Sequence, residues 1–335
     1  MREKLEKHQA WLYLAAVLSG MAIGRIAPGQ TGSWEQLLWP ALGVLLYATF
    51  IQVPLVHLGM AFRDRRFLAA LLTGNFILMP LVVGALLPFL PDEPAIRLGV
   101  LLVLLVPCTD WFISFTHLGG GDGTRAIAAA PVLLIAQLIL LPAYIWLFMG
   151  DVAIELTLGS HLLPAFFGLI VIPLLLAWWT ERLTETHPLL QTMRSWLGWV
   201  PVPVLALVIF LIAGSQVRLV TDNAVLLPPV LFVFVFYLVA AALIGKGLQQ
   251  LCGFKPAAGR TLAFSFGTRN SFVMLPLALS LPEVWRAAVV VIVFQSLVEL
   301  FGMVAYLRWL PRLIQGPTES QAVGLRPTNS NRPSD

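Results

Sequence analysis

Three ionisable side chains lie near the middle of long apolar stretches of the sequence. They are Asp110, Arg269 and Glu299. A charge at the centre of a bilayer is costly unless it is paired or hydrated, so each is a candidate for carrying a solute, a proton or an ion. The alternative is a structural ion pair between Arg269 and one carboxylate. Such a pair would still leave the other carboxylate available to carry a proton or a cation.

Two of the apolar stretches are interrupted by helix-disfavouring and polar residues. The first reads VPCTDWFISF (106–115) and contains Pro107, and the second reads FSFGTRNSFVMLPL (264–277) and contains Gly267. A broken helix leaves backbone N–H and C=O groups that lipid cannot satisfy, so a break is expected where the backbone lines a cavity or binds something. The amino ends of half-helices carry partial positive charge, which suits an anion or a polarised oxygen. The two interruptions therefore predict a binding site.

Cys108 stands directly at the first interruption. A buried cysteine is usually a small hydrophobic residue, but at a helix break its thiolate could bind a soft metal or metalloid. Other polar groups in the spans could complete a cavity, although each is more often a hydrogen bond between helices. The histidines show no spacing suited to a catalytic metal, and we expect no resident metal or cofactor. The expected substrate-binding residues are Cys108, Thr109, Arg269, Asn270 and Ser271, and the expected cavity-lining residues are Asn75, Gln137 and Gln295.

The elements that position these residues are predicted to be membrane spans. Of the 335 residues, 59% are hydrophobic and only 11% are charged. This composition excludes a soluble enzyme, a nucleic-acid-binding domain and a disordered protein, and it makes the lipid bilayer the main environment of the chain. Because about 20 apolar residues span a bilayer, the sequence predicts an all-α membrane protein with ten spans. They are 8–24, 36–62, 67–91, 98–118, 126–150, 156–180, 195–217, 223–245, 261–281 and 287–307.

The positively charged residues of the loops predict the orientation of these spans. With ten spans, the loops and termini on one side hold sixteen Lys and Arg residues, whereas the other side holds only four. Positive loops face the cytoplasm, so both termini are expected to be cytoplasmic in an inner, multi-pass membrane protein. We expect residues 1–315 to form a single transporter domain and residues 316–335 a disordered tail.

Ten spans divide into two sets of five, residues 8–150 and 156–310. An odd number of spans in each half requires the second half to insert upside down relative to the first, which is the inverted-repeat plan of many secondary transporters. The interruptions fall in the fourth span of each half, that is, in spans four and nine. A glutamine also stands in the fifth span of each half, at Gln137 and Gln295. The sequence thus predicts two broken helices that cross near the membrane centre.

Residues 10–310 resemble the bile acid:sodium symporter superfamily, and within it the arsenical-resistance permeases (Acr-type arsenite efflux carriers). Three motifs carry this resemblance: Cys108-Thr109, fourteen residues before Asp122 of Leu118-x-x-Gly121-Asp122; Leu297-Val298-Glu299; and Thr268-Arg269-Asn270-Ser271. The resemblance implies that Cys108 is an arsenite-handling thiol. Phe272, however, stands where those permeases have a glutamate, and Arg269 stands where sodium-coupled relatives have a glutamine. Because a fixed guanidinium would supply the charge of a sodium ion, we expect a proton rather than sodium as the coupling ion.

The expected function is export of arsenite, antimonite or a related small oxyanion by proton antiport, with Glu299 and Asp110 as the coupling groups. The alternative is an organic-anion carrier of the bile acid:sodium symporter type, in which Arg269 binds a carboxylate. A membrane-embedded enzyme or receptor is least favoured, because the sequence contains no metal cluster, no nucleophile–base pair and no soluble domain. No nucleic-acid partner is expected.

Overall fold

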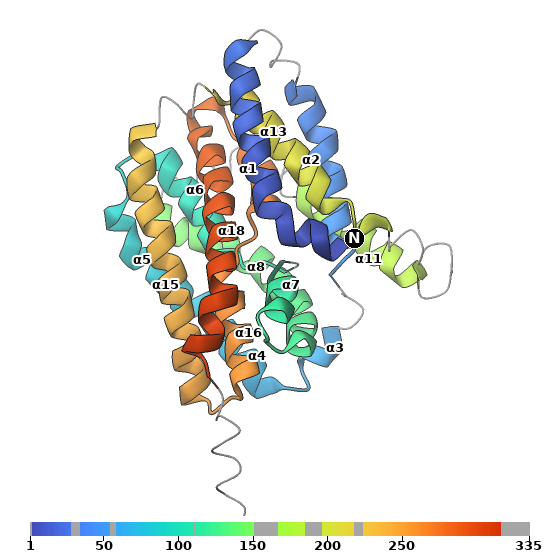
Figure 1. The fold of residues 1–335 in the computed structure, drawn as a ribbon, viewed down its shortest axis with the longest axis vertical. Coiled ribbons are helices and arrows are strands. Elements are labelled where there is room, and N and C mark those ends of the chain that lie inside the picture. Colours follow the sequence, from blue (N-terminus) through green and yellow to red (C-terminus); the bar gives the residue numbers. More distant parts are fainter. Residues whose placement is uncertain are drawn as a thin grey trace, which may run out of the picture.

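The structure is a computed structural model that describes residues 2–27, 34–53, 58–109, 111–150, 167–184, 196–217 and 224–315. Within these ranges the chain forms helices and no β-strand, and most helices run along the long axis of the molecule (Figure 1). The prediction of an all-helical chain is therefore confirmed for the described residues. Four helical segments there are long and apolar enough to cross a membrane: Arg65–Phe89, Gly123–Met149, Leu227–Leu251 and Glu283–Leu313.

The helices follow one another along the chain with short connections. In the amino-terminal half they are α1 (Arg2–Ile26), α2 (Trp34–Phe50), α3 (Leu58–Ala61), α4 (Arg65–Thr73), the π-helix η3 (Gly74–Leu78), α5 (Met79–Leu86), the 3-10 helix η4 (Leu87–Phe89), α6 (Pro94–Leu104), α7 (Trp111–Leu118) and α8 (Gly123–Met149). In the carboxy-terminal half they are the π-helix η5 (Phe167–Val171), α11 (Ile172–Thr184), α13 (Pro201–Ser215), η6 (Ala224–Leu226), α15 (Leu227–Leu251), α16 (Pro256–Gly267), α17 (Ser271–Leu279), η7 (Glu283–Trp285) and α18 (Ala287–Leu313).

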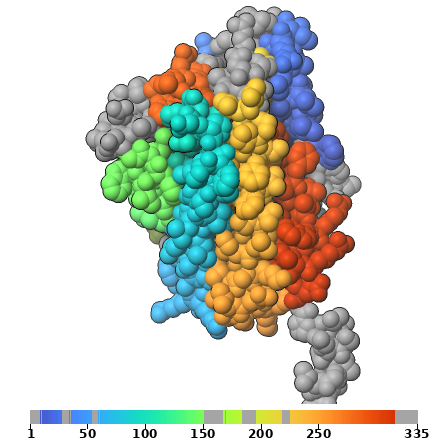
Figure 2. All heavy atoms as spheres, turned by 90° about the vertical axis from the view of Figure 1, so that its left-hand side faces the viewer, coloured from blue at the N-terminus to red at the C-terminus, as the bar shows by residue number. Residues whose placement is uncertain are grey.

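These helices form two groups. The first, here called the α1 group, consists of α1, α2, α11 and α13, in which α13 packs against both α1 and α2. The second, here called the crossing group, contains α4 to α8 and α15 to α18. Figure 2 shows one face of the crossing group, where α15 lies between the α4–α6 segment and α18. Within the α1 group, a side chain at Gly24 would overlap the backbone of Gly214, so small residues allow α1 and α13 to approach closely.

Two helices of the crossing group are broken near the centre of the molecule. The first break separates α6 from α7, and the second separates α16 from α17. Pro107 contributes to the first break, because proline lacks an N–H and disfavours helical backbone in the residue before it. At the second break, a side chain on Gly267 would come within 2.8 Å of the ring of Tyr306. Both predicted interruptions are thus confirmed, and α16 and α17 are buried almost throughout their length.

The ten-span plan is only partly confirmed. The predicted span 36–62 contains two helices, α2 and α3, with residues 54–57 outside the described ranges. The predicted span 67–91 is one helical segment, but it passes through a π-helical turn. Only residues 167–180 of the predicted span 156–180 are described. The inverted repeat, the division into domain and tail, and the orientation of the termini therefore stay predictions.

Candidate functional site

The two helix breaks meet and satisfy each other's backbone. The N–H of Cys108 donates to the carbonyl of Thr268 at 3.1 Å, and the N–H of Asn270 donates to the carbonyl of Val106 at 2.8 Å. These bonds form an isolated antiparallel bridge between Pro107 and Arg269. Unwound backbone inside a membrane requires such partners, because no water is available there. The contact, here called the helix crossing, joins segments about 160 residues apart in sequence.

Arg269 is held at the helix crossing with only 2% of its surface exposed. Its Nη2 atom donates to Oδ1 of Asn75 at 3.1 Å and to the carbonyl of Phe266 at 2.5 Å. Its guanidinium carbon lies 5.2 Å from the centre of the Tyr237 ring. The carbonyl end of a helix carries partial negative charge, so the last turn of α16 is a favourable place for this cation.

Glu299 reaches the same crossing from α18 and is also 2% exposed. Its Oε2 atom accepts hydrogen bonds from the backbone N–H of Arg269 at 2.9 Å and from Nε2 of Gln295 at 2.7 Å. Gln295 in turn accepts a hydrogen bond from the hydroxyl of Ser271 at 2.5 Å. This chain of hydrogen bonds connects α18 to the first residue of α17.

Among the described residues, the guanidinium of Arg269 makes no ion pair with a carboxylate. The direct pair of Arg269 with Glu299, considered from the sequence, is replaced by a bond from the Arg269 backbone. The second predicted coupling residue, Asp110, lies outside the described residues. The two opposite charges of Arg269 and Glu299 therefore share one buried cluster while the side of the guanidinium away from Asn75 stays open.

Several buried polar atoms at the helix crossing have no hydrogen-bond partner within the described part of the chain. They are Nε and Nη1 of Arg269, both amide atoms of Asn270, and the hydroxyl of Thr109. Asn270 and Thr109 are each 1% exposed. Buried polar atoms are almost always hydrogen-bonded, since leaving one unpaired costs about 1–3 kcal/mol. Donors and acceptors left open together in one place therefore indicate a site for a polar solute.

Asn75 takes part in this site from the π-helix η3. Its amide nitrogen donates to the hydroxyl of Ser265 at 2.9 Å, while its oxygen accepts from Arg269. A π-helical turn often occurs at functional sites, because it shifts one side chain out of the regular helical register. Next to it, a side chain on Gly74 would overlap the ring of Phe266, so this glycine allows η3 to approach α16.

The other predicted site residues have less to do with the hydrogen-bonded cluster. Gln137 is buried in α8, but neither of its amide atoms has a partner among the described residues, and nothing links it to Arg269. Cys108 is 1% exposed and lies in the main hydrophobic core directly at the helix crossing. Within the described ranges, no group of three or more His, Cys, Asp or Glu residues could hold a metal ion.

Sequence reasoning missed two contributors to the site. Tyr237 of α15 supports the guanidinium with its ring and donates its hydroxyl to the carbonyl of Phe266 at 3.1 Å. Ser265 bonds Asn75 and presents its carbonyl to Arg269 at 3.4 Å. The only signal in the sequence was a phenol or hydroxyl in the middle of an apolar span.

A comparison with protein families gives this arrangement its context. The sodium bile acid symporter family matches residues 39–223, which is more than half of the chain. The chain belongs to the sodium bile acid symporter family. No curated protein matches the chain. As a member of the sodium bile acid symporter family, the protein is an integral multi-pass membrane transporter of a small molecule, in a family of transporters rather than enzymes.

The match to the sodium bile acid symporter family includes the first helix break and ends before the second. Asn75 and Cys108 lie inside the matched range, whereas Arg269 and Glu299 lie beyond it. The superfamily resemblance seen in the sequence is confirmed by this match. The closer resemblance to the arsenical-resistance branch stays a prediction.

Proposed function

We propose that the protein is a secondary carrier that exports a small hydroxylated metalloid, arsenite or antimonite, in exchange for a proton. The observation that carries this proposal is the set of open polar atoms at the helix crossing. Arg269 offers two hydrogen-bond donors there, and Asn270 offers a donor and an acceptor side by side. A solute with several hydroxyl groups both accepts and donates hydrogen bonds, so it matches this mixture of open atoms.

The charge of the site favours this substrate class over a sodium-coupled one. The buried guanidinium of Arg269 repels a second cation placed nearby, because charge repulsion is strong where water is excluded. The same guanidinium stabilises partial negative charge on the oxygens of an arsenite or antimonite molecule. Sodium binding at the helix crossing is therefore disfavoured, and the coupling ion is a proton.

Glu299 is the proposed proton carrier. In its ionised form it accepts hydrogen bonds from the Arg269 backbone and from Gln295. A proton on Glu299 weakens both bonds and thereby loosens the contact between α18 and the helix crossing. If the substrate requires the crossing to be intact, proton binding and substrate binding exclude one another, which is the linkage that antiport needs.

Cys108 supplies a soft ligand for trivalent arsenic or antimony beside these polar groups. The thiol replaces one hydroxyl group of the metalloid, and that hydroxyl leaves with the thiol proton as water. This step needs no oxidant or reductant. It adds selectivity for the metalloid over organic solutes of similar size, because a carboxylate makes no comparable bond to sulfur.

The test is transport by the purified protein in liposomes, with arsenite as the solute. A pH gradient is expected to drive arsenite movement, whereas a sodium gradient is not. Cys108→Ala and Arg269→Lys are expected to lower the rate about tenfold or more, the latter because lysine keeps the charge but loses the planar fork of donors. Cys252→Ala is the matched control, since Cys252 lies in the α15–α16 turn away from the helix crossing. If Cys108→Ala transports arsenite as wild type does, the metalloid proposal is wrong.

The second candidate is an organic-anion carrier, which the family match and the open donors of Arg269 both favour. In this case a substrate carboxylate occupies the guanidinium. The same liposomes distinguish it when they are assayed with a bile acid under a sodium gradient. Uptake that is abolished by Arg269→Ala and unaffected by Cys108→Ala would support the organic-anion carrier and reject the metalloid carrier.

A further inference from the structure

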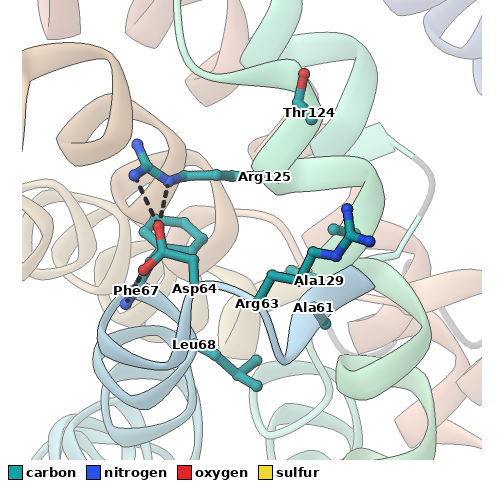
Figure 3. A pocket seen from close by; sticks show the side chains of 9 residues that line it. Ala61, Arg63, Asp64, Phe67, Leu68, Thr124, Arg125 and Ala129 are labelled. Carbon is teal, nitrogen blue, oxygen red and sulfur yellow. Dashed lines mark hydrogen bonds and ion pairs between the residues drawn. The ribbon is translucent and has the colours of Figure 1, made fainter. Parts of the chain in front are cut away.

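A second polar feature lies far from the helix crossing, at one end of the crossing group. Here a cavity of about 420 Å³ opens between α3, the start of α4 and the start of α8 (Figure 3). Both α4 and α8 begin membrane-spanning segments at this point. The cavity is therefore located where two spans enter the bilayer, on the side predicted to be cytoplasmic.

One of the two arginines lining the cavity is fixed in place. Arg125 donates to Oδ2 of Asp64 through Nε at 2.9 Å and Nη2 at 2.7 Å, and to Asp122 through Nη1 at 3.1 Å. Its guanidinium carbon also lies 5.3 Å from the centre of the Phe67 ring. Because both aspartates bind this one arginine, they neutralise little of the positive charge elsewhere at the cavity.

The other arginine is available to a ligand. Arg63 is exposed and has no hydrogen bond or ion pair within the described residues. Figure 3 shows its side chain pointing away from the Arg125–Asp64 pair, along α8 and past Ala129. Thr124 contributes a hydroxyl from the first turn of α8, where the positive end of the helix faces outward. A phosphate suits this combination, because guanidinium groups bind phosphate oxygens strongly.

The deeper wall of the cavity is apolar. Ala61, Leu68 and Ala128 form a small hydrophobic cluster separate from the main core, and all three line the cavity. The cavity thus has a cationic rim at the bilayer boundary and a methyl-lined wall below it. A free phosphate ion would use only the rim, whereas a phospholipid would use both parts.

We propose that this cavity binds an anionic phospholipid, with Arg63 and Thr124 contacting the phosphate and an acyl chain lying against the Ala61–Leu68–Ala128 wall. Basic pockets between membrane spans recognise anionic headgroups in this way. The bound lipid contacts both α8 of the crossing group and α3, the helix that follows α2 of the α1 group in the chain. It is therefore placed to influence how these two groups move relative to each other.

The test is native mass spectrometry of the full-length protein in detergent, titrated with phosphatidylglycerol or with phosphatidylcholine of the same acyl chains. Phosphatidylglycerol is expected to bind more tightly. Arg63→Gln is expected to weaken its binding about fivefold, since a basic residue near the bilayer surface contributes about that much. Thr124→Val should weaken it to a smaller extent. Arg308→Gln is the matched control, because it removes an exposed arginine of α18 that does not line the cavity.

Three results would overturn the proposal: equal binding of the two lipids, equal affinities for Arg63→Gln and Arg308→Gln, or displacement of phosphatidylglycerol by inorganic phosphate at the same concentration. The last result would assign the site to a free phosphate ion. Thermal unfolding of each variant shows whether it remains folded. Binding is measured without transport, so the outcome is independent of the proposed substrate.

Discussion

At the helix crossing, the guanidinium of Arg269 is held by an amide oxygen, a backbone carbonyl and the face of a tyrosine ring. This arrangement fixes a positive charge in the membrane without a direct carboxylate contact among the described residues. It leaves Nε and Nη1 open, so the residue is both buried and available for binding. Glu299 compensates the charge at short range through the Arg269 backbone.

The role of Glu299 leads to a prediction about coupling. Glu299→Gln should abolish the response of arsenite transport to a pH gradient, because the amide cannot take up a proton. Exchange of labelled for unlabelled arsenite at equal pH should continue, since the amide oxygen still accepts one hydrogen bond from Arg269. Both rates are measured in the same liposomes. Glu283→Gln, which changes the 3-10 helix η7 before α18, serves as the control. Loss of exchange together with coupling would mean that Glu299 supports the structure rather than proton transfer.

The sequence identified part of this cluster and missed another part for a physical reason. Arg269, Glu299, Asn75 and Gln295 were predictable, since charged or amide groups in apolar spans are costly. Tyr237 was not, because a phenol is tolerated at many depths in a membrane protein and has no characteristic spacing. Gln137 was predicted by its position in the chain, yet nothing in the described residues connects it to the cluster.

At the scale of elements, the two breaks were visible in the sequence but their contact was not. Proline and glycine mark the places where a helix is interrupted. The backbone bonds between Cys108 and Thr268, and between Asn270 and Val106, depend on how distant spans pack. The π-helix η3 was likewise unpredicted, because its register depends on contacts with α16.

Close packing of η3 on α16 leads to a prediction about stability. In Gly74→Ala, the new methyl group would overlap the ring of Phe266, and overpacking of this kind costs about 1–3 kcal/mol. We expect a lower unfolding temperature, measured in detergent, and partial recovery in the double variant Gly74→Ala/Phe266→Leu. Gly247→Ala in α15 is the control, because nothing lies within 4 Å of the added methyl group. Equal effects of Gly74→Ala and Gly247→Ala would contradict the packing argument.

The start of α4 leads to a prediction about pH. Burial raises the pKa of Asp64, but the hydrogen bonds from the Phe67 N–H and Arg125, with the charges of Arg125 and Arg66, outweigh burial and lower it below its usual range. Ionised Asp64 therefore stabilises the folded state above the unfolded pKa of about 3.9, and this stabilisation is lost as the pH falls through the lower folded pKa.

We expect Asp64→Asn to unfold at a lower temperature than wild type at pH 7, with a difference that shrinks below about pH 4. Asparagine is as good a helix cap as aspartate, so the change isolates the charge. Asp92→Asn is the control, because Asp92 pairs with Arg97 while 92% exposed, and such pairs contribute little. A difference between Asp64→Asn and wild type that is constant from pH 7 to pH 3 would contradict the proposed role of the Asp64 charge.

At the scale of the whole molecule, the α1 group and the crossing group are the two bodies that could move during transport. The solute site lies entirely within the crossing group, so movement of that group relative to the α1 group would expose it to either side of the membrane. The composition of the sequence correctly placed the chain in lipid. The grouping of helices could not be derived from composition, since it depends on which spans pack together.

Movement between the groups can be tested by linking them. Trp11 of α1 and Phe301 of α18 are in edge-to-face contact, with ring centroids 6.3 Å apart, and both are exposed on the surface. In a Cys252→Ser background, Trp11→Cys and Phe301→Cys joined by a short bifunctional reagent should lose most arsenite transport. Each single cysteine treated with the same reagent should remain active. Full activity of the linked protein would show that these two helices do not separate during transport.

The pairing of opposite charges in one buried cluster has an electrical consequence. With Glu299 ionised, the described part of the helix crossing carries no net charge, so the membrane voltage does little work when the empty site reorients. A proton on Glu299 leaves one positive charge there, on which each 100 mV acts with about 2.3 kcal/mol. The voltage would therefore drive one half of the cycle and leave the other unaffected, and a carrier of a neutral solute would generate a measurable current.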